Sequence, residues 1–176
     1  MAITLVVNPG SSSKKFALYR EHKLLINAYV ERKEDGFEIC TAVSGTQQLC
    51  EQLDKNSFKD SLSNFLMRAK QENHINDFYE VAKVAVRVVA PGTYFQSHRV
   101  INEDFIIRLQ KLSSIVPLHI PHILQEIEAI KKFLPSAEVI AISDSYFHST
   151  IPSHVRHYSL PEDESIKHDI YHFGYH

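Results

Sequence analysis

The order of apolar runs along the chain constrains its fold more than any other feature. Short runs rich in Val, Ile and Leu come first, and polar turn residues separate them by only a few positions. Runs of this kind predict strands that pair antiparallel with their chain neighbours. The strands expected in this first part are residues 3–7, 16–19, 24–30 and 36–41.

From residue 46 onward the pattern changes. Residues 46–71 carry apolar side chains at steps of three and four, which predicts helix. Asn56 and Ser57 either interrupt this helix or cap a second one. Residues 81–89 form a nearly continuous apolar run, which is typical of a strand covered on both faces. The other expected elements are two helices, 102–112 and 121–134, and a strand, 138–142. This order predicts an α/β domain with a mixed sheet and flanking helices.

Composition restricts the classes of function. The hydrophobic fraction of 44% and charged fraction of 23% are typical of a globular protein, and the formal net charge is −2. Lysines and arginines are scattered, so a concentrated basic face for nucleic acid is not expected. No apolar run approaches the roughly 18 residues of a membrane span. We therefore expect a cytoplasmic protein with neither nucleic acid nor membrane as a partner.

Cys40 and Cys50 are the two cysteines of the 176-residue chain. Two cysteines are too few for a disulfide framework, and their spacing is not that of a metal site. We therefore expect two buried or half-buried thiols.

A polar turn at residues 8–15 separates the first two predicted strands. Gly10 can adopt backbone conformations that other residues avoid, so successive amides could point into one concavity. Three serines and a lysine add donors around the same point, and phosphate oxygens accept such hydrogen bonds strongly. The common phosphate loop leads into a helix, whereas this turn leads into a strand. An ordinary polar hairpin turn is the alternative, and the residues alone favour neither.

Two charged residues lie within or just after the buried strands. Arg87 interrupts the run 81–89, where a charge is costly unless it reaches a cleft or a partner. Its planar guanidinium suits an anion clamp, and pairing with a carboxylate is the alternative. Asp144 follows the strand 138–142, and ligands gather at the carboxyl ends of strands in open α/β sheets. A carboxylate there could hold Mg²⁺, or it could cap a helix.

Five short segments occur in a recognisable order. They are Asn-Pro-Gly-Ser-Ser-Ser-Lys-Lys at 8–15, Val-Arg-Val-Val at 86–89, Pro-Leu-His at 117–119, Asp-Ser-Tyr-Phe-His at 144–148 and Phe-Gly-Tyr-His at 173–176. The ordered set resembles the acetokinase family of acetate kinases, in the sugar kinase, heat-shock protein 70 and actin superfamily. The family's corresponding motifs are Asn-x-Gly-Ser-Ser-Ser-x-Lys, His-Arg-Val-Val, Pro-Leu-His, Asp-Thr-Ala-Phe-His and Tyr-Gly-Phe-His. The resemblance covers essentially the whole chain and corresponds to the N-terminal half of the family.

The resemblance implies a fold and an activity. The fold is a ribonuclease H-like (actin-like ATPase) domain with a mixed five-stranded sheet and flanking helices. The activity is reversible transfer of the γ-phosphoryl group of ATP to acetate, with Mg²⁺, which gives ADP and acetyl phosphate. Positioning and electrostatics supply most of the catalysis in reactions of this class.

The resemblance also implies roles for individual residues. Arg87 would hold the carboxylate and offset charge on the phosphoryl group, and Asp144, with Asn8, would organise the metal indirectly. His119 and His176 would donate hydrogen bonds to the equatorial oxygens. The phosphate side of the cleft would be lined by Asn8, Ser11, Ser13 and Lys15. The substrate pocket would be formed by Arg87 together with the apolar groups of Val89, Leu118 and Tyr175.

The chain departs from the family on the substrate side. The family's His-Arg-Val-Val-His-Gly-Gly is Val-Arg-Val-Val-Ala-Pro-Gly at 86–92, and its Pro-Leu-His-Asn-Pro is Pro-Leu-His-Ile-Pro at 117–121. Propionate and butyrate therefore stay open as substrates beside acetate. A second alternative is a module that binds phosphate or an acyl phosphate without turnover.

Length is the largest departure, because the family continues for about as many residues again. We expect residues 1–150 to form the ribonuclease H-like domain and 151–176 to begin a second, nucleotide-side domain. Residues 153–176 are rich in His and Tyr without a clear period, so we expect them to pack against another surface. The expected partners are acetate, acetyl phosphate and either a complementary C-terminal chain or another copy of this one. The chain alone is expected to show little activity.

Overall fold

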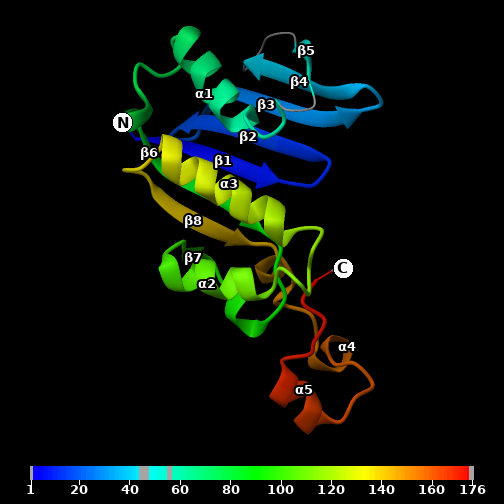
Figure 1. Cartoon of the computed structure of the whole chain (residues 1–176). Helices are drawn as coiled ribbons and strands as arrows, with labels where there is room; N and C mark the ends of the chain where they lie inside the picture. The colour runs from blue at the N-terminus through cyan, green and yellow to red at the C-terminus, as the bar shows by residue number, and fades with distance from the viewer. Residues whose placement is uncertain (1, 44–47, 55–56, 175–176) are drawn as a thin grey trace.

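Within residues 2–43, 48–54 and 57–174, which the computed structural model describes, the strands form one mixed eight-stranded sheet (Figure 1). Its strand order is β5-β4-β3-β2-β1-β6-β8-β7. The strands are β1 (Ile3–Pro9), β2 (Ser13–Arg20), β3 (Lys23–Lys33), β4 (Gly36–Val43), β5 (Leu49–Leu53), β6 (Val81–Val88), β7 (Arg99–Val100) and β8 (Glu138–Ser143).

Strand β1 joins two halves of the sheet that differ in direction. Strands β1 to β5 pair antiparallel with their chain neighbours, because short turns connect them. On its other side β1 pairs parallel with β6, and β6 pairs parallel with β8. The carboxyl ends of β1, β6 and β8 therefore lie at the same edge of the sheet.

One face of the sheet carries the core. Along β1 the side chains of Ile3, Leu5 and Val7 are buried, in the alternation expected of a strand with one covered face. Three helices cover that face: α1 (Ser61–Gln71), α2 (Glu103–Lys111) and α3 (Ile120–Phe133), with α3 packed between the other two. Figure 1 shows α1 and α3 lying across the antiparallel and central strands.

A buried ion pair links strand β2 of the sheet to helix α3. Lys14 Nζ lies 2.7 Å from Glu126 Oε2, and the two side chains are 2% and 1% exposed. Lys14 also donates to the backbone oxygen of Phe58 at 3.0 Å. Burial raises the pKa of Glu126, while the charge of Lys14 acts in the opposite direction. The pair therefore holds two costly charges inside the core.

The predicted count of five strands is wrong, and so is the prediction of helix from residue 46. Residues 49–53 form β5, and helix begins only at Ser61. A spacing of four between apolar residues also suits one face of a strand, which explains the error. The two-residue β7 is too short to leave a sequence pattern. Asn56, one of the two residues at which the helix pattern was expected to break, lies outside the described residues, as do residues 46, 47 and 55.

The prediction that residues 81–89 form a strand covered on both faces is only half right. Residues 81–88 do form β6, whose buried residues include Val84, Val86 and Val88. Between them, Ala85 and Arg87 are half-buried on the opposite face. This second face is where the charged side chain emerges.

The expectation of two free thiols is wrong. Cys40 and Cys50 form a disulfide, with their Cα atoms 4.0 Å apart. They are direct partners in the antiparallel pairing of β4 and β5. Because β5 was assigned to a helix, the sequence pattern gave no reason to place the two cysteines opposite each other.

The C-terminal segment lies beyond the β8 side of the sheet, where Figure 1 shows α4 (Ser153–Arg156) and α5 (Glu162–His168) apart from the other helices. The guanidinium of Arg156 stacks 4.9 Å from the ring of Tyr171, and the backbone N–H of His172 donates to the oxygen of Arg156. The segment thus packs on itself. None of the helices that the structure describes combines the length and apolar character that a membrane crossing requires.

Candidate active site

Three predicted site residues meet at the carboxyl ends of the parallel strands. Arg87 Nε donates to Asp144 Oδ1 at 2.9 Å, and its Nη2 lies 2.8 Å from the same oxygen. Its Nη1 donates to Asn8 Oδ1 at 3.2 Å. We call these three residues the Arg87 cluster.

Strand order and register explain why they meet. Val7 of β1 is opposite Val86 of β6, so the next residues, Asn8 and Arg87, come to the same place at the strand ends. Arg87 is opposite Ile142 of β8, and Asp144 follows that strand directly. The backbone N–H of Asp144 donates to the oxygen of Val88 at 3.0 Å, which continues the ladder by one residue.

Both interpretations of Arg87 have support. It has the carboxylate partner that one alternative required, namely Asp144. Its side chain is nevertheless 42% exposed, so part of the guanidinium is open to a ligand. Both contacts from Arg87 to Asp144 go to Oδ1, so Oδ2 is available to a further partner.

The serine-rich segment is the tight turn between β1 and β2. Lys15 is the cross-strand partner of Asn8, and its Nζ lies 5.1 Å from the ring centre of Tyr29. Ser11 is exposed at the turn, and Ser13 is half-buried at the start of β2. Asn8 is thus part of the Arg87 cluster, Lys15 is beside it, and the two serines flank it at the turn.

The expected reason for Gly10 is wrong. The described glycines with positive φ are Gly36 and Gly92, not Gly10. At Gly10 a Cβ would lie 2.7 Å from the backbone oxygen of Ser13, so close approach across the turn explains the residue. The turn is therefore tight, rather than left-handed, at this position.

The predicted substrate side lines a cavity of about 860 Å³. Val89, Leu118, His119 and Asp144 all contribute to its wall. Leu118 is 70% exposed, so this wall presents an apolar surface to the cavity. The pKa of the His122 imidazole is lowered, first by burial and then by the charges of Lys14 and His119. Tyr175 and His176 lie outside the described residues.

The C-terminal segment supplies cavity residues that the sequence did not single out. Tyr158, Ile170, Phe173 and Gly174 all contribute to the wall of the cavity. The segment also contacts the rest of the protein directly, because Arg156 Nη2 donates to Gln96 Oε1 at 2.8 Å. Its richness in aromatic residues was the available signal, but without a period it could not show which side chains face the cavity.

One missed residue attaches this segment to the loop after β6. Asp169 Oδ2 accepts from the backbone N–H of Thr93 at 2.8 Å. Gly92 has φ 101°, and a Cβ there would lie 3.2 Å from the same Asp169 oxygen. A Pro-Gly pair such as that at 91–92 is typical of a turn, but its distant partner Asp169 has no local signature in the sequence.

The Arg87 cluster also fits a magnesium ion. Asp144 and Asn8 offer hard oxygen atoms, and Mg²⁺ is usually bound by one or two carboxylates, phosphate oxygens and water. The adjoining guanidinium contacts one carboxylate oxygen, so the other can accept a metal-bound water.

Comparison with known proteins identifies relatives over the whole length of this chain. Acetate kinase 1 of Lactococcus lactis is 32% identical over all of this chain and 45% of its own length. The acetate kinase of Helicobacter pylori is 34% identical over 98% of this chain and 44% of its own length. This chain therefore spans a little under half the length of the curated relatives it matches.

Solved structures are similar over the same extent. The acetate kinase of Porphyromonas gingivalis matches with a TM-score of 0.84 and 27% identity, over 100% of this chain and 45% of that one. A propionate kinase of Francisella tularensis matches with a TM-score of 0.83 and 27% identity, over 99% and 45%. The ribonuclease H-like (actin-like ATPase) fold is confirmed, with eight strands instead of five. The Acetokinase family model matches residues 3–176, and this chain belongs to that family.

Proposed function

We propose that this chain supplies the acyl- and phosphoryl-side wall of an acetate kinase-like phosphotransferase. The reaction is ATP + acetate = ADP + acetyl phosphate. The observation that carries the proposal is the Arg87 cluster, in which a partly exposed guanidinium and an amide lie beside Asp144, a carboxylate in the wall of an apolar-lined cavity.

The chemistry follows from what these groups can do. Acetate and the transferring phosphoryl group are both anions, and a guanidinium held between them offsets their repulsion. The hydrogen bonds that Arg87 donates to Asp144 and Asn8 keep its guanidinium in one orientation, so less entropy is lost when the anions bind. Bound through Asp144 and Asn8, Mg²⁺ would neutralise charge on the phosphate oxygens.

The other residues take supporting roles. Val89 and Leu118 line the cavity beyond the cluster and suit a short alkyl group. His119 lines the same cavity and would donate to an equatorial oxygen. By the family resemblance, His176 would take the same role and Tyr175 would contribute to the substrate pocket. Lys15, Ser11 and Ser13 would serve the phosphate side. Two domains fit the arrangement, with residues 1–150 carrying the sheet and 151–176 beginning the nucleotide side.

The first experiment measures anion binding. Inorganic phosphate and acetyl phosphate are titrated calorimetrically into the protein and into an Arg87→Ala variant. Losing hydrogen bonds from a charged donor costs about 1.5–3 kcal/mol, so we expect binding to weaken about tenfold to a hundredfold. Arg108→Ala is the matched control, because Arg108 also pairs with an aspartate, Asp104, but on α2. Equal affinities in the protein and in Arg87→Ala would reject the proposal.

The second experiment measures turnover. The protein is mixed with ATP, Mg²⁺ and acetate, and acetyl phosphate is trapped with hydroxylamine. We expect background activity from this chain alone and recovery when the remaining C-terminal portion of a relative is added. Full activity from this chain alone would contradict this expectation, because it would show that the acyl- and phosphoryl-side wall is sufficient for turnover.

A binding module without turnover is the second candidate. It is favoured by the chain's span of about 45% of its relatives, and it predicts anion binding with no rescue by added C-terminal portions. Propionate or butyrate is an alternative substrate, favoured by the size of the cavity and by the similarity to a propionate kinase. Comparing hydroxamate yields for the three acids distinguishes them.

A further inference from the structure

Edge strand β5 is held to the sheet by few side-chain contacts. Its described side chains, Leu49 to Gln52, are all exposed, and Leu49 is 59% exposed. Arg68 of α1 lies 3.0 Å from Glu51, but Glu51 is 62% exposed, and exposed ion pairs contribute little. Because none of these described side chains is a buried apolar group, β5 is held mainly by its backbone hydrogen bonds, which alone hold an edge strand weakly.

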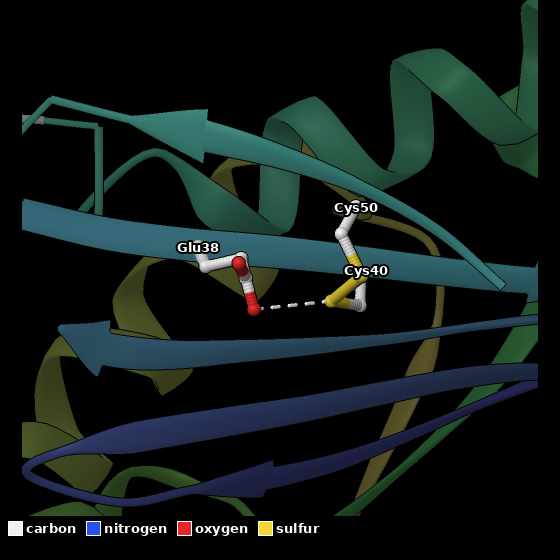
Figure 2. Close-up of side chains that lie close together, drawn as sticks. All are labelled: Glu38, Cys40 and Cys50. Carbon is white, nitrogen blue, oxygen red and sulfur yellow. Dashed lines mark hydrogen bonds between the residues drawn. A yellow bond between two sulfur atoms is a disulfide. The ribbon is translucent and has the colours of Figure 1, made fainter.

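The disulfide is the exception. It joins Cys50 of β5 to Cys40 of β4, and Cys40 is only 7% exposed. Figure 2 shows the bond bridging the two strands, with Glu38 beside it on β4. Among the described residues, it is the covalent link between β5 and the rest of the sheet other than the chain itself.

The residues around the disulfide are compatible with both the oxidised and the reduced form of the two cysteines. Glu38 Oε2 lies 3.5 Å from Cys40 Sγ (Figure 2). A reduced Cys40 thiol can therefore donate to this carboxylate, so the buried sulfur keeps a partner after the bond is broken. Cys50 is exposed and can be reached by a thiolate from solution.

We propose that Cys40 and Cys50 form a reversible thiol–disulfide exchange site that controls whether β5 stays docked on β4. An incoming thiolate attacks Cys50 Sγ, the bond to Cys40 breaks, and Cys40 leaves as a thiolate that takes up a proton. A second thiol attacks the mixed disulfide and releases Cys50. One protein disulfide and two thiols thus become one protein dithiol and one disulfide of the reductant.

Reduction breaks the disulfide, which is the main side-chain link between β5 and β4. The antiparallel ladder between β4 and β5 then opens more often, and the backbone groups of β4 on that side meet water. The rest of the sheet is unaffected, because β4 remains paired with β3 and buries Phe37 and Ile39. The switch therefore acts on one edge of the sheet.

Hydrogen exchange of the segment Gly36–Val43 tests the proposal. The protein is compared after treatment with oxidised glutathione and after treatment with dithiothreitol. We expect exchange in this segment to rise at least tenfold on reduction, with no change in Ser13–Arg20. Alkylation followed by mass spectrometry should label neither cysteine in the oxidised protein and both in the reduced one.

Two variants make the test specific. Cys50→Ser should exchange as fast as the reduced protein and ignore both reagents. Leu49→Ala, a change at another exposed position of the same strand, should keep the full redox response. Equal exchange of Gly36–Val43 in the two redox states would overturn the proposal. So would alkylation of both cysteines after oxidation, or a stable glutathione adduct on Cys50.

Discussion

Replacing Lys14 by methionine tests how strongly the stability of the fold depends on the buried ion pair between Lys14 and Glu126. The Nζ to Oε2 distance is 2.7 Å, and neither side chain is more than 2% exposed. The substitution keeps the apolar stem of the side chain and removes the ammonium. It leaves the Glu126 carboxylate, whose Oε1 already has no hydrogen-bond partner, buried without a counter-charge.

Two estimates of the loss converge. Removing one partner of a buried pair costs about 3–5 kcal/mol. The orphaned carboxyl can instead take up a proton; at 1.36 kcal/mol per pH unit, doing so at pH 7 from the ordinary pKa of 4.5 costs about 3.4 kcal/mol. Protonation therefore limits the charge penalty, and we expect Lys14→Met to lose about 3–4 kcal/mol at pH 7.

The pH dependence has a definite sign. Burial raises the pKa of Glu126 in the folded protein above its unfolded value. A carboxyl of this kind stabilises the fold most at pH below the unfolded pKa, and the contribution is lost as pH rises through the folded pKa. The penalty of Lys14→Met should therefore shrink as pH falls from 7 towards 4.5.

Urea unfolding followed by circular dichroism measures the effect. Lys15→Met is the matched control, because Lys15 is the adjacent exposed lysine, and it should change stability by less than about 0.5 kcal/mol. The double variant Lys14→Met, Glu126→Met should be close to the unmodified protein, because both charges are gone. A loss below about 1 kcal/mol at pH 7, or one that does not vary with pH, would refute the reasoning.

Three further changes have expected outcomes. Gly10→Ala places a methyl group against the backbone oxygen of Ser13, so thermal unfolding should show a loss of about 1–3 kcal/mol. Asn102→Ala removes the side chain that accepts from the Phe105 N–H at the start of α2, and urea unfolding should show a loss of about 1 kcal/mol. Asp169→Ala breaks the bond to the loop after β6, so limited proteolysis should cut the α4–α5 segment faster while global unfolding stays unchanged.

Sequence patterns predicted the elements that have long apolar faces. Strands β1, β6 and β8 and helices α2 and α3 were located within two residues, because each carries either an apolar run or a helical apolar period. Strand β5 was missed since its described side chains are exposed, and an exposed edge strand needs no apolar alternation. The disulfide was missed as a consequence.

The Arg87 cluster was predictable only in part. Arg87 lies 79 residues from Asn8 and 57 from Asp144, so no local period links them. Two general rules, on ligands at strand ends and on charges in apolar runs, pointed to Arg87 and Asp144 individually. Placing all three together required the family resemblance. The buried Lys14 was overlooked because it sits in a run of polar turn residues, where its alternation into the core is hidden.

The mixed directions of the sheet have a consequence for folding. Strands β1 to β5 pair across short connections, so that half can assemble from contacts between chain neighbours. The pairings of β1 with β6 and of β6 with β8 enclose much longer stretches of chain, and such contacts form later. A ribosome-bound chain that has emerged only as far as β5 would thus contain the turn at Gly10 but not the Arg87 cluster, which is completed only when β8 pairs with β6.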